Sequence, residues 1–236
     1  MNTTKRSVFL LLVLGLFSLY AISAQPYGGN VTAGESSRFN ASIAPTMAYA
    51  QAGNVTQLSI DGTALTTSWQ GFYGNVTGTL ILGDANGNKF YTWGNLSSPS
   101  GEVYASRSNS VTWASIDCAS IANITAEQTY LGQTAADPDS VTNTYTLTSH
   151  PSFLVGATNL TGCYSTKAYN SSGVQGNGFW QVLLDDKTNS VYTTLLDNNP
   201  ETGFNNKPWD FQLLVGENGK VGNEAATPYY FYVELQ

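Results

Sequence analysis

The feature that most constrains the fold of this 236-residue chain is a series of short segments in which apolar and polar side chains alternate. The clearest is residues 229–235, where one set of alternate positions is Tyr229, Phe231, Val233 and Leu235 and the other is Tyr230, Tyr232 and Glu234. A period of two places the two sets on opposite faces, which is typical of a β-strand with one face on a core. Many such segments, separated by turn-forming residues, predict a mostly β protein built as an antiparallel β-sandwich.

A second segment, WQGFYGNVTGTLILGD at residues 69–84, is interpreted as one strand that carries an N-glycan acceptor in its middle. Alternation gives an apolar face of Phe72, Gly74, Val76, Gly78, Leu80 and Leu82 and an opposite face of Trp69, Tyr73, Asn75, Thr77 and Thr79. Asn75 is therefore expected on the solvated side. The DANGNK run at residues 84–89 then predicts a hairpin turn into a strand that starts at Lys89.

Other segments extend this pattern along the chain. Strand character is predicted at 54–60, 89–94, 102–107, 141–148, 153–160, 211–216 and, as a second clear hairpin, 179–197. Residues 110–132 predict one short helical or irregular insertion, because Ile121, Ile124, Gln128 and Leu131 fall near helical spacing. No short-period repeat is present, which disfavours a solenoid or a propeller.

The N-terminus predicts export. Residues 1–24 combine a basic start at Lys5 and Arg6 with an apolar run from Val8 to about Ile22 and small residues at the end, which is a signal-peptide pattern. An uncleaved anchor or a pilin-type hydrophobic helix is the alternative. No second apolar run of this length follows, so the mature chain is expected to have no membrane span and to lie outside the cell or on its surface.

The mature chain is interpreted as two parts. Residues 25–53 are rich in Gly, Ser and Ala and contain Pro26 and Pro45, which predicts an extended N-terminal arm. Residues 54–236 are assigned to the β-sandwich domain.

Charge narrows the class of partner. Removal of residues 1–24 leaves seven basic residues against 16 acidic ones, a net charge of −9, which disfavours nucleic acid and anionic lipid. Charged residues make up only 11% of the chain, so Ser, Thr, Asn, Gly and Tyr must supply most of the polar surface. Such a surface fits either an ordinary secreted β protein or one that associates with copies of itself.

Cys118 and Cys163 are the only cysteines. In an exported chain two cysteines most often pair, and this pair would close a 45-residue loop and stabilise the fold by about 4 kcal/mol. A zinc site is poorly supported, because two thiols and the single histidine, His150, leave a four-ligand shell incomplete.

N-glycan acceptor motifs, Asn-x-Ser/Thr, are the most frequent motif in the mature region. They occur at Asn30, Asn40, Asn54, Asn75, Asn95, Asn123, Asn159 and Asn170. Glycans at these positions would shield the backbone and limit unwanted aggregation of a Tyr- and Thr-rich β protein.

Catalytic and metal motifs are weak, so we expect neither an enzyme nor a cofactor. A Ser-His-Asp triad would need His150, which stands beside a turn, and no G-x-S-x-G motif is present. Asp185 and Asp186 are neighbours on a predicted strand and point to opposite faces. The run from Asp84 resembles a calcium loop but has Lys89 and Asn95 at the positions that require Gly and Glu, which favours a hairpin turn. Weak calcium binding at acidic loops is the alternative.

Four aromatic residues lie on faces opposite the apolar rows: Trp69, Tyr73, Tyr230 and Tyr232. Such rings pack under a second layer, form a subunit interface or stack on sugars.

Several segments together resemble a family of uncharacterised archaeal secreted proteins. The likeness is carried by TSWQGFYGNVTGTLILGDANGNKFYTW, GEVYAS, VTWASIDC, FWQVLLDDKTNSVYTTLLD, DFQLLVGENG and TPYYFYVEL, in the same order from about Ala24 to Gln236. The resemblance implies export and a β domain on the cell surface, with Cys118 and Cys163 corresponding to the family's two cysteines, and it implies no reaction or ligand. We therefore expect a structural glycoprotein of an archaeal filament, sheath or layer, or alternatively a carbohydrate-binding or adhesive module.

Overall fold

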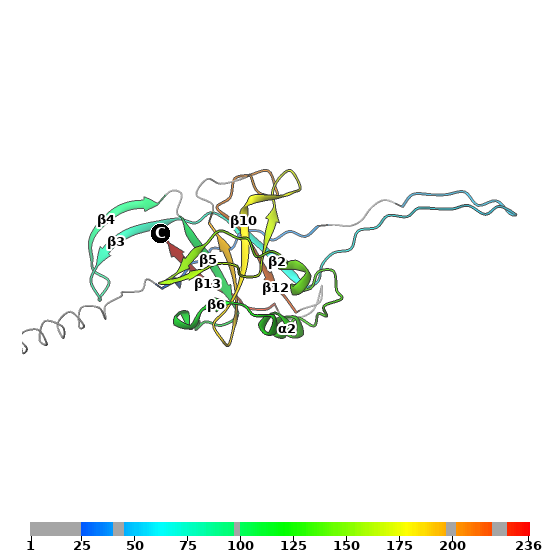
Figure 1. Ribbon diagram of the computed structural model, residues 1–236. Helices are drawn as coiled ribbons and strands as arrows, with labels where there is room; N and C mark the ends of the chain where they lie inside the picture. Colours follow the sequence, from blue (N-terminus) through cyan, green and yellow to red (C-terminus); the bar gives the residue numbers. More distant parts are fainter. Residues whose placement is uncertain (1–24, 40–44, 97–99, 197–201, 219–225) are drawn as a thin grey trace, which may run out of the picture.

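The computed structural model describes residues 25–39, 45–96, 100–196, 202–218 and 226–236 (Figure 1). The predicted signal peptide at 1–24 and the acceptor Asn40 lie outside the described residues. Among the residues that are described, no helix is both long and apolar enough to cross a membrane.

Antiparallel strands dominate the structure, as the alternating segments predicted. In chain order the strands are β1 (Tyr27–Gly28), β2 (Trp69–Gly74), β3 (Gly78–Gly83), β4 (Lys89–Leu96), β5 (Gly101–Ser106), β6 (Asp117–Cys118), β7 (Phe153–Val155), β8 (Thr158–Leu160), β9 (Ser165–Tyr169), β10 (Gln175–Asp185), β11 (Ser190–Leu195), β12 (Phe211–Gly216) and β13 (Tyr230–Leu235). The helices are η1 (Trp113–Ser115), α2 (Ile121–Tyr130) and α3 (Val141–Thr144).

The largest sheet in the described residues has seven strands. Its order is β1-β13-β5-β11-β10, and β9 and β6 share the far side of β10. The predicted hairpin at 179–197 is β10–β11, with Leu184 opposite Val191. The C-terminal alternation is also confirmed, because Phe231 and Val233 pack on one core cluster while Tyr232 packs on the other.

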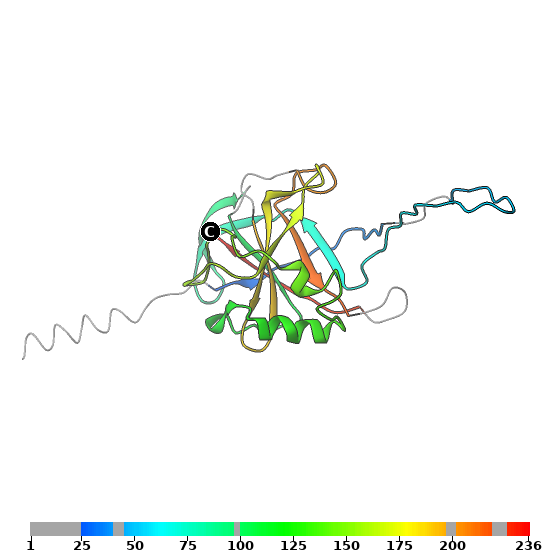
Figure 2. The same ribbon diagram turned by 45° about the vertical axis from the view of Figure 1, so that its right-hand side comes forward.

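Both faces of this sheet are covered (Figures 1 and 2). Leu183 of β10 faces one core cluster together with the β2–β12 sheet and α2, while its neighbours Val182 and Leu184 face a second cluster with η1 and the β7–β8 hairpin. Successive side chains of a strand point to opposite faces, so the part of β10 from Phe179 to Asp185 buries its side chains on both faces. Full burial of each apolar side chain among them contributes roughly 1.5–3 kcal/mol.

The segment 69–84 is two strands, so the prediction of one strand is wrong. β2 pairs with β12, with Phe72 opposite Leu213, whereas β3 pairs with β4 in a separate sheet. The break follows from Asp210, whose amide donates to the Gly74 carbonyl at 3.1 Å and whose Oδ2 accepts from the Val76 amide at 2.8 Å. Asp210 thus replaces strand pairing at this point, and the chain that follows Val76 leaves the core.

The insertion at 110–132 contains the predicted helix. Ser120 caps α2 by a capping box, in which its hydroxyl accepts from the Asn123 amide and the Asn123 side chain accepts from the Ser120 amide. The predicted strand at 141–148 is wrong at its start, which is the short helix α3. Ser140 caps α3 by accepting from the Asn143 amide, and this local cap outweighs the β-propensity of the segment.

The predicted strand at 54–60 is also wrong. Residues 45–67 are exposed throughout and form no strand, and the first long strand is β2 at Trp69. A strand needs a ladder partner, and the rest of the described chain supplies none to this segment. Residues 30–39 and 45–67, named here the excursion, form a long loop that leaves the body and returns to it (Figures 1 and 2).

Candidate functional site

The excursion is anchored to the body at both ends. At its start, Tyr27 and Gly28 pair with Val233 and Tyr232 of β13, and the Gly29 amide donates to the Phe231 carbonyl at 2.9 Å. The first residues of the predicted arm therefore extend the molecule's own sheet.

At the other end, two side chains bind the same acidic residue. The Thr66 hydroxyl donates to Oδ2 of Asp139 at 2.6 Å, and the indole N–H of Trp69 donates to the Asp139 carbonyl at 2.6 Å. The excursion is therefore a loop with two fixed ends.

Apolar side chains of the excursion stand in solvent. Tyr49 and Ile60 are 91% and 86% exposed. The full set of large exposed apolar residues here is Val31, Phe39, Met47, Tyr49, Val55, Leu58, Ile60 and Leu65. So much exposed apolar surface on one segment is unusual for a soluble protein and is typical of interaction surfaces.

The β3–β4 hairpin is a second exposed apolar surface. Its large apolar residues in solvent are Leu80, Ile81, Leu82, Phe90, Tyr91 and Trp93. Phe90 is 83% exposed, and the rings of Tyr91 and Trp93 lie 5.0 Å apart on the strand surface. A two-stranded hairpin alone is marginally stable in water, so a partner that covers it would stabilise it.

The predicted hairpin turn at 84–89 is confirmed. Oδ1 of Asp84 accepts from the amides of Asn86 and Asn88 at 2.9 and 2.8 Å, and Oδ2 accepts from the Asn88 side chain at 2.8 Å. The hydrogen bond from the Asn88 side chain is the main cause that holds the pKa of Asp84 below its ordinary value. Gly87 has a φ of +82°, which a side chain would strain.

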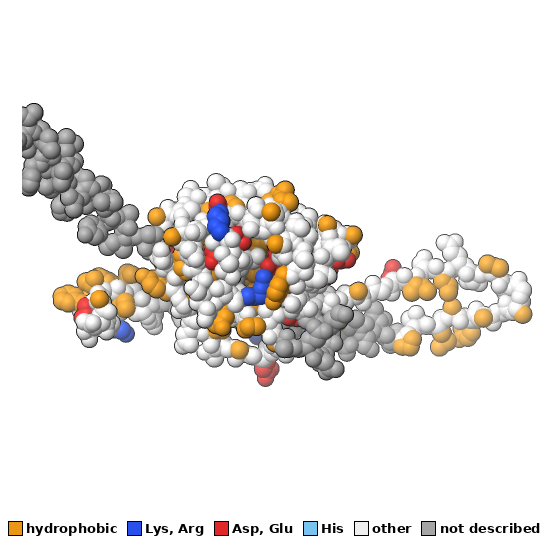
Figure 3. Space-filling model, turned by 90° about the horizontal axis from the view of Figure 1, so that it is seen from below, with side chains coloured by type: hydrophobic (Ala, Val, Ile, Leu, Met, Phe, Trp, Pro, Cys, Tyr) orange, Lys and Arg blue, Asp and Glu red, His pale blue; other side chains and the backbone are white. Residues whose placement is uncertain are grey.

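The two exposed surfaces lie at opposite ends of the molecule (Figures 1 and 2). Figure 3 shows hydrophobic side chains gathered on the projecting hairpin at one end and along the excursion at the other. One molecule therefore cannot cover its own hairpin with its own excursion in this arrangement.

Two of the four aromatic residues singled out in the sequence are packed inside. Trp69 was expected opposite the apolar face, but it packs on the core, with its ring 6.2 Å from those of Tyr145 and Tyr192. Tyr232 packs on the second core cluster, 5.2 Å from Trp113. For these two the second-layer interpretation is correct.

The other two, Tyr73 and Tyr230, are exposed by 44% and 43%. Tyr73 belongs to a surface cluster that sequence reasoning missed: its ring lies 5.0 Å from Phe204 and 5.1 Å from Trp209, both tilted edge to face. The indole N–H of Trp209 donates to Asn205 at 2.8 Å, which fixes the ring. The signal in the sequence was two aromatic residues within the polar stretch FNNKPW.

The described acceptor asparagines lie at the surface. Exposed ones are Asn30, Asn54, Asn75, Asn95 and Asn159. Asn123 and Asn170 are half-buried, and the side-chain oxygen of Asn170 accepts from the Ser172 amide at 3.0 Å in a turn.

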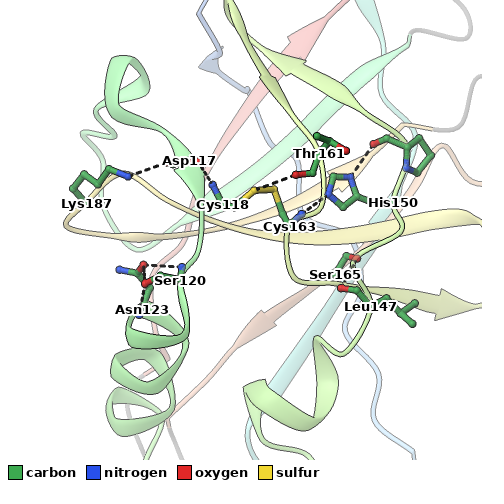
Figure 4. Close-up of a disulfide and its surroundings, with 11 residues drawn as sticks. Asp117, Cys118, Ser120, Asn123, Leu147, His150, Thr161, Cys163, Ser165 and Lys187 are labelled. Carbon is green, nitrogen blue, oxygen red and sulfur yellow. Dashed lines mark hydrogen bonds and ion pairs between the residues drawn. A yellow bond between two sulfur atoms is a disulfide. The ribbon is translucent and has the colours of Figure 1, made fainter.

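Cys118 and Cys163 form the predicted disulfide, which joins β6 to the chain after β8 (Figure 4). His150 lies beside it and binds the backbone of Cys163 (Figure 4). Nε2 of His150 accepts from the Cys163 amide at 2.9 Å, so the proton of the neutral ring is on Nδ1, which donates to the Pro151 carbonyl at 2.8 Å. His150 thus has a structural role beside the predicted turn.

Two glutamates share a buried site. Glu102 on β5 and Glu234 on β13 are cross-strand partners, and the Tyr104 hydroxyl lies between them. Burial, followed by the charge of Glu234, raises the pKa of Glu102 to about 8. Glu234 accepts from the Gly156 amide at 3.0 Å, yet burial still raises its pKa.

An ion pair between half-buried Arg107 and buried Glu127 joins α2 to the sheet. Arg107 donates through both terminal nitrogens to Glu127, at 2.5 and 2.6 Å, and the Tyr192 hydroxyl donates to the same carboxylate at 2.6 Å. Burial alone would raise the pKa of Glu127, but these hydrogen bonds and the Arg107 charge outweigh it and lower that pKa. The guanidinium also lies 3.9 Å above the Tyr130 ring.

No group of three or more His, Cys, Asp or Glu side chains that could hold a metal ion occurs in the ranges that the structure describes. No protein-family model, curated protein or solved structure matches this chain.

Proposed function

We propose that this chain is an exported structural glycoprotein that joins copies of itself into a filament, sheath or layer on an archaeal cell surface. The observation that carries the proposal is the pair of exposed apolar segments at opposite ends of one molecule, the excursion and the β3–β4 hairpin. Export and the archaeal surface rest on the signal-peptide pattern and on the resemblance described above.

The contact proposed is head to tail. The excursion of one copy lies along the β3–β4 hairpin of the next, adding main-chain hydrogen bonds to the open edges of a two-stranded sheet and covering its aromatic side chains. Two different surfaces in one contact make the association heterologous, and a heterologous contact repeats into an open polymer unless its rotation closes a ring.

The test uses two variants that each disable one surface. The excursion is altered by Val55→Ser/Leu58→Ser/Ile60→Ser, and the hairpin is altered by Phe90→Ser/Trp93→Ser. All five side chains are exposed, so both variants should fold. Negative-stain microscopy and light scattering of the secreted protein should show polymers for the wild type and monomers for each variant.

Mixing the two variants tests the head-to-tail geometry. Each retains one working surface, so an equimolar mixture should give 1:1 dimers and no polymer. Tyr169→Ser/Val174→Ser, which alters exposed residues away from both surfaces, should polymerise like the wild type. Unchanged polymerisation of both surface variants, or a mixture that stays monomeric, would count against the proposal.

A carbohydrate-binding or adhesive module is the second candidate. The exposed cluster of Tyr73, Phe204 and Trp209 favours it, whereas Trp69 is unavailable because it packs on the core. Glycan-array binding by the unglycosylated monomer, lost in Trp209→Ser, would support this function over a purely structural one.

A further inference from the structure

We infer that Asn75 carries an N-linked glycan whose first sugars pack on the ring of Tyr73 and the aromatic cluster that Tyr73 forms with Phe204 and Trp209. This inference rests on the glycosylation that is part of the proposed function, and it assigns the occupant of the cluster to the chain's own modification.

The acceptor and the ring share one side of the chain. Burial alternates from residue 72 to 77: Tyr73, Asn75 and Thr77 are exposed, while Phe72, Gly74 and Val76 are half-buried. In an extended backbone, side chains two residues apart stand on the same face about 7 Å from each other. A sugar on the Asn75 side chain therefore starts beside the Tyr73 ring.

The backbone of the acceptor is fixed on both sides. Asp210 binds the Gly74 carbonyl through its amide at 3.1 Å and the Val76 amide through its carboxylate at 2.8 Å. Asn75 lies between these two anchors, so the direction of its side chain is set by the fold.

The aromatic cluster offers a surface that suits a sugar. Tyr73 and Phe204 are 44% and 54% exposed, and the hydrogen bond from Trp209 to Asn205 fixes the third ring. The C–H face of a hexose packs against an aromatic face and removes both from water. Covalent attachment two residues away gives the sugar a high effective concentration at this surface, which a free saccharide lacks.

Asn159 provides a contrast within the same domain. It is exposed on β8, and the residue two positions before it is Ala157, so no ring stands beside it in the chain. A glycan there should add solubility without packing on an aromatic surface.

The experiment compares protein secreted from insect cells, which glycosylate Asn-x-Ser/Thr, with protein from a bacterial periplasm, which does not. Thr77→Ala and Thr161→Ala remove the acceptor motifs of Asn75 and Asn159. Each is combined with Tyr73→Ser, Tyr73→Phe or Tyr230→Ser, where Tyr230 is a matched tyrosine with 43% exposure. Glycopeptide mass spectrometry gives occupancy, and thermal unfolding gives Tm.

The expected result is a coupling between Tyr73 and the Asn75 motif in insect-cell protein. Thr77→Ala should lower Tm by roughly 2–4 °C, and this loss should vanish in the Tyr73→Ser background but persist with Tyr73→Phe or Tyr230→Ser. Thr161→Ala should show no such coupling, and periplasmic protein should show none at either motif. An unoccupied Asn75, or the same loss with and without Tyr73→Ser, would overturn the inference.

Polymer formation by the same samples separates this inference from the proposed function. Polymers from wild-type insect-cell protein in which Asn75 is unoccupied would contradict only the glycan inference. Monomers whose Asn75 glycan couples to Tyr73 would contradict only self-assembly.

Discussion

Glu102 lies directly opposite Glu234 on neighbouring antiparallel strands, and the Tyr104 hydroxyl is 3.4 Å from one carboxylate and 3.3 Å from the other. Two negative charges in one buried site repel each other and lose their hydration. Burial and the Glu234 charge raise the pKa of Glu102 to about 8, so Glu102 is mostly protonated at neutral pH.

This pair predicts that the fold weakens at alkaline pH. The folded pKa of Glu102 exceeds the ordinary value of 4.5, so the folded state holds a proton that the unfolded chain releases. The resulting stability is fully present below about pH 4.5 and is lost as pH rises through about 8. Thermal unfolding followed by circular dichroism should give a Tm that falls between pH 5 and pH 9.

Glu102→Gln tests the assignment, because the amide stays neutral over that range. Its Tm should change less with pH than that of the wild type, and the variant should be the more stable of the two at pH 9. If the Tm of the variant and that of the wild type fell equally with rising pH, the loss of stability at alkaline pH would belong to another group.

Removal of the half-buried Arg107 charge, the partner of the buried Glu127, should be costly. Arg107→Met leaves Glu127 buried without its partner, and breaking a buried pair in this way costs about 3–5 kcal/mol. Urea unfolding measures the loss. Lys187→Met removes the exposed pair with Asp117 and should cost less than about 1 kcal/mol, so equal losses in the two variants would contradict this role for Glu127.

Loss of the Cys118–Cys163 disulfide should destabilise the monomer by about 4 kcal/mol, the chain-entropy value for a loop of 45 residues. Urea unfolding of Cys118→Ala/Cys163→Ala against the oxidised wild type gives this difference. The wild type unfolded with a reductant should match the double variant, and a stability independent of reductant would show that the loop constraint contributes little.

Self-assembly should respond to salt as an apolar contact does. The excursion has three charged residues in its described part, Glu35, Arg38 and Asp61, and the hairpin segment 78–96 has two, Asp84 and Lys89. Sodium chloride screens charges and should leave polymer yield unchanged, whereas sulfate strengthens apolar burial and should raise it. Polymers that dissociate at high sodium chloride would indicate a charge-driven interface instead.

Features with a local cause could be predicted from the sequence. The hairpin turn at Asp84 depends on residues within four positions of it, and the strand at 230–235 depends on its own alternation. The disulfide was predicted from the cysteine count and the signal-peptide pattern, and the structure contains it.

Features with a distant cause could not be predicted from the sequence. Asp210 ends the pairing of β2, and Asp139 binds the indole of Trp69. Both aspartates are far from β2 in the sequence, so the residues around positions 69 and 75 give no indication of either contact. The surface cluster is similar, because Phe204 and Trp209 reach Tyr73 only through the β2–β12 pairing. Alternation gave the correct faces at 72–77 and 230–235, whereas the distant hydrogen bond to Asp139 holds Trp69 on the same core cluster as Phe72.

The excursion begins on β13 through Gly29 and ends at Asp139 through Thr66. In a head-to-tail polymer, tension on the excursion would enter the subunit along two lengths of backbone at once. Each length would carry part of the force, so one ruptured attachment would leave the subunits still tethered by the other.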